Sequence, residues 1–191
     1  MKIKKFNAVL SLLTTLAIFI HVGYTAYAYL TFYYNPLLKE ITAMPFMAFA
    51  CLHAICAMGI VFFSADGTKL GQYPKKNIGT ILQRASAIHI LPLLILHINT
   101  FDILKTCAGN GKWFFFALVM IFQPIFYATV FTHVTVSVSR ALITLGRLSS
   151  LEKKKTVDRI VLIICAVFFL VASYAVIKGQ LTMFLPQGGA A

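Results

Sequence analysis

The sequence predicts an all-α integral membrane bundle of five transmembrane helices, and three observations support that fold class. Hydrophobic residues make up 60% of the 191 residues and charged residues only 12%, and the mean hydropathy is +0.85. A soluble domain of this size needs a larger charged surface, so lipid must be the solvent for most of the chain. Five apolar segments, each at least as long as the roughly 20 residues that cross a bilayer, fill most of the sequence. We therefore treat residues 1–191 as a single transmembrane domain.

The first two segments are predicted at 6–33 and 44–64. The first follows three lysines, as a signal peptide would, but it is longer than the apolar region of about 7–15 residues typical of signal peptides. We therefore expect it to remain as a helix. Asn35-Pro36 marks the turn between the two segments, and Asp66-Gly67 opens the loop that follows the second.

The remaining segments are predicted at 81–100, 113–145 and 158–179. Tyr73-Pro74 ends the loop before the third segment, and two glycines around Asn110 separate the third from the fourth. Pro92 and Pro124 fall inside the third and fourth helices. Membrane helices tolerate such kinks where neighbouring helices satisfy the freed carbonyl.

Charge predicts the orientation. With the N-terminus inside, thirteen Lys and Arg residues lie on the inner face and four on the outer face. Cytoplasmic ends of spans carry an excess of these residues, so the N-terminus is predicted to be cytoplasmic and the C-terminus outside, in the inner (cytoplasmic) membrane of a cell. The basic residues flank spans instead of forming one soluble face, which argues against nucleic-acid binding. The inner set is Lys2, Lys4, Lys5, Lys69, Lys75, Lys76, Arg84, Arg140, Arg147, Lys153, Lys154, Lys155 and Arg159.

One histidine stands in each of the first four segments: His21, His53, His97 and His133. An ionisable residue within a span is a functional candidate, and four such residues make two axial pairs for two haems. Counted by helix rise, His21 and His97 lie about 20–24 Å from the inner face, and the other two about 16–18 Å. These depths favour the pairs His53/His133 and His21/His97. Alternatively, each imidazole bonds to a neighbouring helix and serves packing.

A haem also needs partners for its propionates near the bilayer edge. Polar or basic residues at span ends could supply them, and those residues could equally bind a quinone: Gln83, Arg84, Ser86, Arg140, Lys112 and Trp113. His89 fits neither pair, so we expect a hydrogen-bonded packing residue there; a quinone contact or a proton path is the alternative. The four cysteines lack the spacing of zinc or iron–sulfur sites.

Two stretches resemble a known family. The third segment reads LQRASAIHILPLLILH, ending at His97, and the fourth reads HVTVSVSRALITLG from His133 to Gly146. Both are similar to the five-helix, di-haem cytochrome b subunit of succinate:menaquinone and menaquinol:fumarate oxidoreductases. His53-Ala54 with Gly71-Gln72-Tyr73 is similar to that family's second helix and following loop. The resemblance covers nearly the whole chain, with weak identity outside these motifs.

The resemblance implies two haem b groups, one on His53/His133 near the cytoplasm and one on His21/His97 near the outside. It further implies a flavoprotein and an iron–sulfur subunit as separate chains on the cytoplasmic face, and a quinone, for which the family leans to menaquinone. The chain would carry electrons and would not itself act on the dicarboxylate. Gln83, Arg84 and Ser86 also resemble the inner-side quinone motif of other succinate dehydrogenases.

The chain departs from the family at two places. Phe131 and Thr132 stand where some fumarate-reducing members carry a glutamate, and Glu40, the acid nearest the outer end of the first helix, is expected in a loop. The side of the quinone reaction and the direction of catalysis therefore stay open. Two other functions remain: a di-haem subunit of a formate dehydrogenase or hydrogenase, and a haem-free small membrane protein such as a transporter or assembly factor.

Overall fold

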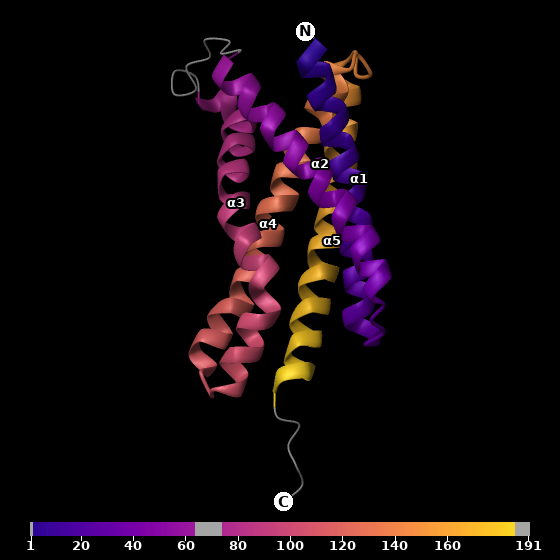
Figure 1. Cartoon of the computed structure of the whole chain (residues 1–191). Helices are drawn as coiled ribbons and strands as arrows, with labels where there is room; N and C mark the ends of the chain where they lie inside the picture. The colour runs from indigo at the N-terminus through magenta and orange to yellow at the C-terminus, as the bar shows by residue number, and fades with distance from the viewer. Residues whose placement is uncertain (1, 64–73, 186–191) are drawn as a thin grey trace, which may run out of the picture.

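The computed structural model describes residues 2–63 and 74–185 and confirms the predicted fold class (Figure 1). Five α-helices, and no strand, occur in these ranges. All five are long and apolar enough to cross a membrane, so this is a multi-pass membrane protein. The helices are α1 (Lys2–Thr31), α2 (Pro36–Phe63), α3 (Pro74–Gly109), α4 (Trp113–Thr144) and α5 (Leu151–Phe184).

The helix α2 begins eight residues earlier than the predicted start at residue 44. Asn35 caps this helix, because its side-chain oxygen accepts a hydrogen bond from the N–H of Leu38 at 3.2 Å. Pro36 occupies the first helical position, where its missing N–H costs nothing. Asn35-Pro36 is thus a helix start as well as a turn. Glu40, expected in a loop, lies within the first turns of α2.

The helices α3 and α5 extend beyond the predicted spans at both ends. Ser150 is the N-cap of α5, and its hydroxyl accepts a hydrogen bond from the N–H of Lys153 at 3.2 Å. The first turns of α5 are rich in lysine, which a hydropathy window excludes although lysine is a good helix former. The extra turns are therefore polar continuations of apolar spans.

The helix α4 ends as its sequence predicts. Gly146 has a φ of +75°, a left-handed conformation that suits glycine. Its N–H bonds to the carbonyl of Ile143 at 2.9 Å, and the N–H of Arg147 bonds to the carbonyl of Leu142 at 2.9 Å. These bonds satisfy the last carbonyls of the helix. The prolines predicted within helices, Pro92 and Pro124, do lie inside α3 and α4.

The helix α4 is the centre of the bundle and packs against α1, α3 and α5, whereas α2 packs against α1 alone in the part of the chain that the structure describes. Residues of α1, α4 and α5, among them Ile18, Phe131 and Ala172, form the main buried cluster. Two ends can be defined in Figure 1. The N-terminal end holds the starts of α1, α3 and α5, and the C-terminal end is the opposite one.

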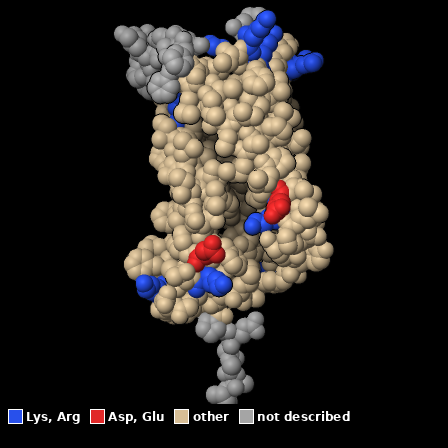
Figure 2. Space-filling model, viewed as in Figure 1, with Lys and Arg blue, Asp and Glu red and all other residues tan. Residues whose placement is uncertain are grey.

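Charged side chains lie near the two ends of the bundle, as Figure 2 shows for one face. Large apolar side chains such as Leu16, Ile55, Ile95 and Leu170 are more than half exposed along the helices between these ends. An uncharged, apolar surface of this kind suits contact with lipid acyl chains. Figure 2 also shows a dark hollow between the α1–α2 side and the α3–α4 side.

Candidate functional site

The structure brings the rings of His53 in α2 and His133 in α4 close together in an edge-on arrangement. Their ring centroids are 6.4 Å apart, with an angle of 67° between the ring planes. A metal bound at about 2 Å from one nitrogen of each imidazole would hold the centroids about 6 Å apart. The two rings thus stand at the separation that a metal between them needs. They do so across helices that are not packed against each other.

The Nδ1 nitrogen of His133 already has hydrogen-bond partners. Its Nδ1 lies 3.1 Å from the Ser86 hydroxyl and 3.2 Å from the carbonyl oxygen of Gln83. The Ser86 hydroxyl donates its own proton to the carbonyl of Leu82 at 2.6 Å, so it is the acceptor towards His133. Nδ1 must therefore carry the proton, and Nε2 keeps its lone pair. This is the tautomer that a metal-binding histidine adopts when its other ring nitrogen is hydrogen-bonded.

His53 has no such partner at the same nitrogen. Its Nδ1 is buried and has no hydrogen bond to any described residue. A buried polar atom without a partner costs free energy, so Nδ1 of His53 would gain from a bond to a further group. Two imidazoles supply the axial ligands of a haem, and the porphyrin supplies the four in its plane. The residues at this position fit that group.

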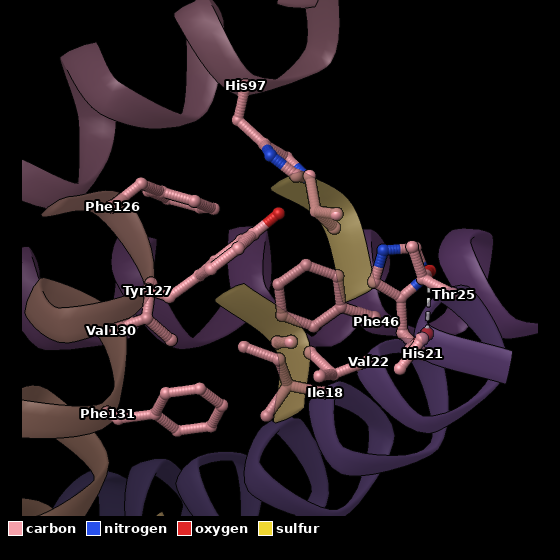
Figure 3. A pocket seen from close by; sticks show the side chains of 13 residues that line it. Ile18, His21, Val22, Thr25, Phe46, His97, Phe126, Tyr127, Val130 and Phe131 are labelled. Carbon is pink, nitrogen blue, oxygen red and sulfur yellow. Dashed lines mark hydrogen bonds between the residues drawn. The ribbon is translucent and has the colours of Figure 1, made fainter. Parts of the chain in front are cut away.

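The second predicted pair, His21 of α1 and His97 of α3, lines one cavity (Figure 3). The cavity has a volume of about 40 Å³, and its lining is almost wholly apolar. Phe46 stacks on the ring of His21, with centroids 5.8 Å apart, and Phe126 stacks on the ring of His97 at 4.7 Å. The two histidines share an apolar cavity, in which Phe46 lies beside His21 and Tyr127 lies beside His97.

The hydrogen-bonding pattern of the first pair recurs in the second. The Nδ1 of His97 lies 2.9 Å from the side-chain oxygen of Gln123, whereas the Nδ1 of His21 is buried with no partner in the described residues. In each pair, one imidazole is oriented by a hydrogen bond at Nδ1, and Nδ1 of the other has no partner among the described residues. The same pattern in both pairs is compatible with a haem held by two histidines.

Three of the six predicted propionate or quinone residues, Gln83, Ser86 and Arg140, gather beside His133. The guanidinium of Arg140 donates to the side-chain oxygen of Gln83 at 2.8 Å and to the Thr80 hydroxyl at 2.9 Å. The amide nitrogen of Gln83 donates to the Ser137 hydroxyl at 3.0 Å, and Ser86 is the partner of His133. A cation and several donors therefore lie at the N-terminal end of the bundle, beside the first pair.

The other candidates lie apart from this cluster. Arg84 forms no side-chain hydrogen bond or ion pair with the residues that the structure describes. Lys112 and Trp113 start α4 at the C-terminal end of the bundle. His89 bonds through Nδ1 to the carbonyl of Ala85 at 2.7 Å and is exposed. It is hydrogen-bonded, as expected, but it is not a buried packing residue. Gly71-Gln72-Tyr73 and Lys69 lie outside the described residues.

The sequence reasoning missed a polar network around Gln123. This buried side chain contacts His97, Thr100 and Tyr127. A signal for it existed, because a glutamine inside an apolar span is costly unless its amide is fully hydrogen-bonded.

Comparison with protein-family models, with curated proteins and with solved structures finds no match for this chain. Within residues 2–63 and 74–185, no group of three or more His, Cys, Asp or Glu side chains is arranged to hold a metal ion. The paired histidines and their hydrogen-bond partners are therefore the groups that can give the site its chemistry.

Proposed function

We propose that the chain is the di-haem cytochrome b membrane anchor of a succinate:quinone or quinol:fumarate oxidoreductase. The observation that carries the proposal is the 6.4 Å separation of the His53 and His133 rings, combined with the proton that Ser86 and Gln83 hold on Nδ1 of His133. The shared cavity of His21 and His97 and the resemblance of the third and fourth helices to that family add to it.

In this proposal the protein binds two haem b groups, one on His53/His133 and one on His21/His97. Haem iron, when bound, alternates between ferric and ferrous states and supplies one-electron transfer. The chain would orient the two imidazoles of each pair, exclude water with its aromatic side chains, and place the guanidinium of Arg140 near the first pair. A nearby cation favours the reduced, more electron-rich state of that site.

The partners follow from the same proposal. An iron–sulfur subunit and a flavoprotein would dock on the cytoplasmic face, at the N-terminal end of the bundle, in the inner (cytoplasmic) membrane. Electrons would pass between the iron–sulfur subunit and a membrane quinone, for which the family leans to menaquinone. The residues beside His133 that could contact a propionate or quinone are Gln83, Ser86 and Arg140.

The test is a reduced-minus-oxidised spectrum and a haem-to-protein ratio of the complex purified with its native partner chains. We expect b-type absorption and two haems per chain. His53→Ala and His133→Ala should each remove the same haem, and His21→Ala and His97→Ala should each remove the other. His89→Ala is the matched control, because this exposed histidine is bonded to its own helix, and it should retain both haems.

Three outcomes would contradict the proposal. A colourless complex after expression with ample haem would exclude a cytochrome. Loss of a haem by His53→Ala with no effect of His133→Ala would break the first pair. Co-purification with a formate dehydrogenase or hydrogenase subunit, in place of a flavoprotein that reduces fumarate or oxidises succinate, would assign the chain to another respiratory enzyme.

A further inference from the structure

We propose that Gln123 is a positioning residue that sets the tautomer of His97 and the electron donation of its ring, and thereby lowers the reduction potential of the haem that His97 binds. This inference rests on the proposed function, because it requires a haem on His97. Its observable is the potential of one of the two haems, which is independent of turnover by the complex.

The amide of Gln123 is held in one orientation. The side chain is 2% exposed, and its Nε2 donates to the Thr100 hydroxyl oxygen. The Thr100 hydroxyl already donates its own proton to the carbonyl of Leu96 at 2.9 Å, so it can only accept from Gln123. The NH₂ group of the amide therefore faces Thr100, and its oxygen faces His97.

This orientation fixes the tautomer of His97. The Gln123 oxygen, 2.9 Å from Nδ1, is an acceptor, so Nδ1 must carry the proton and Nε2 keeps the lone pair that binds iron. A hydrogen bond from the distal N–H to an acceptor also raises the basicity of the ligating nitrogen. A more basic ligand stabilises ferric over ferrous iron, which lowers the potential.

Tyr127 tunes the same bond. Its hydroxyl donates to the Gln123 oxygen at 3.1 Å, and Figure 3 shows it pointing towards the His97 ring. One carbonyl oxygen thus accepts from two donors. Because each donor draws electron density from the shared oxygen, the Tyr127 hydroxyl weakens the bond from His97. Removing Gln123 and removing the Tyr127 hydroxyl should therefore shift the potential in opposite directions.

The experiment is a redox titration of both haems in the purified complex. The haem on His21/His97 is identified by its loss in His97→Ala. Gln123→Leu should raise the potential of that haem, and Tyr127→Phe should lower it. Gln123→Glu keeps an acceptor oxygen and should not raise it. The haem on His53/His133 should keep its potential throughout. Gln180→Leu is the matched control, because Gln180 is also 2% exposed but bonds to Tyr29.

The outcomes separate this inference from the proposed function. A wild-type complex without b-type absorption would contradict the function itself. Two haems in the wild type, with an unchanged potential in both Gln123→Leu and Tyr127→Phe, would overturn the role of Gln123 alone. Shifts of the same sign in both variants, or an equal shift in Gln180→Leu, would indicate general loosening of the cavity and would also overturn it. If Gln123→Leu fails to assemble, Tyr127→Phe and Gln123→Glu decide the question.

Discussion

The ring of Tyr29 in α1 lies directly against Gly179 of α5, so close that a Cβ atom at residue 179 would overlap the ring. The side chain of Gln180, next along α5, donates to the Tyr29 hydroxyl at 3.3 Å. The absence of a side chain at Gly179 is therefore what lets α1 and α5 approach closely here, as small residues do between membrane helices.

Gly179→Ala should lower the stability of the bundle by about 1–3 kcal/mol, because an aromatic ring in a packed interface cannot move aside at low cost. Thermal unfolding of the complex in detergent measures the effect. Gly23→Ala is the matched control: nothing lies within 4 Å of a Cβ at Gly23, so alanine should be neutral or mildly stabilising there. Equal melting temperatures for the two variants would contradict the packing role of Gly179.

Ser86→Ala should raise the potential of the haem on His53/His133 by a small amount. The variant removes one of the two acceptors of the His133 N–H, and the carbonyl of Gln83 remains as the other. A redox titration measures the shift. Ser139→Ala replaces an equally well buried serine of α4 and should leave the potential unchanged; a comparable shift in both would mean that Ser86 has no specific effect.

Arg140→Gln should lower the potential of the same haem and also destabilise the bundle. It removes a cation from the neighbourhood of His133 and breaks the part-buried hydrogen bonds to Gln83 and Thr80 that connect α4 to α3, at a cost of about 0.5–1.5 kcal/mol for each bond. Redox titration and thermal unfolding give the two readouts.

Arg147→Gln is the matched control for Arg140→Gln, because Arg147 is exposed just beyond the end of α4. Water and salt screen a charge at such a position. We expect it to leave both the potential and the melting temperature near the wild-type values. If Arg147→Gln lowered the haem potential as much as Arg140→Gln does, the effect would not depend on closeness to His133, and the specific role of Arg140 would be contradicted.

Fusions of alkaline phosphatase, which is active only outside the cytoplasm, test the predicted orientation. A fusion after residue 191 should be active and one after Ser149, between α4 and α5, should be inactive, because basic residues concentrate at the N-terminal end of the bundle. The reverse pattern would place the N-terminus outside and would exclude cytoplasmic partners at that end.

Much of the fold was predictable from composition, because length and hydropathy alone define a membrane helix. The helix starts at Pro36 and Leu151 were missed, since capping by Asn35 and Ser150 is local chemistry that a hydropathy window averages away. Within the site, the histidines and the polar residues Gln83, Ser86 and Arg140 were predicted from the sequence as candidate site residues. The sequence could not reveal Gln123 as the partner of His97, because these residues lie on different helices and only packing brings them together.

The packing of α2 against α1 alone has a consequence for assembly. The Phe46 side chain of α2 packs against the main buried cluster, but within the described residues α2 has no backbone-level packing with α4. In the proposed function, a haem between His53 and His133 would therefore add the missing connection between α2 and the central helix.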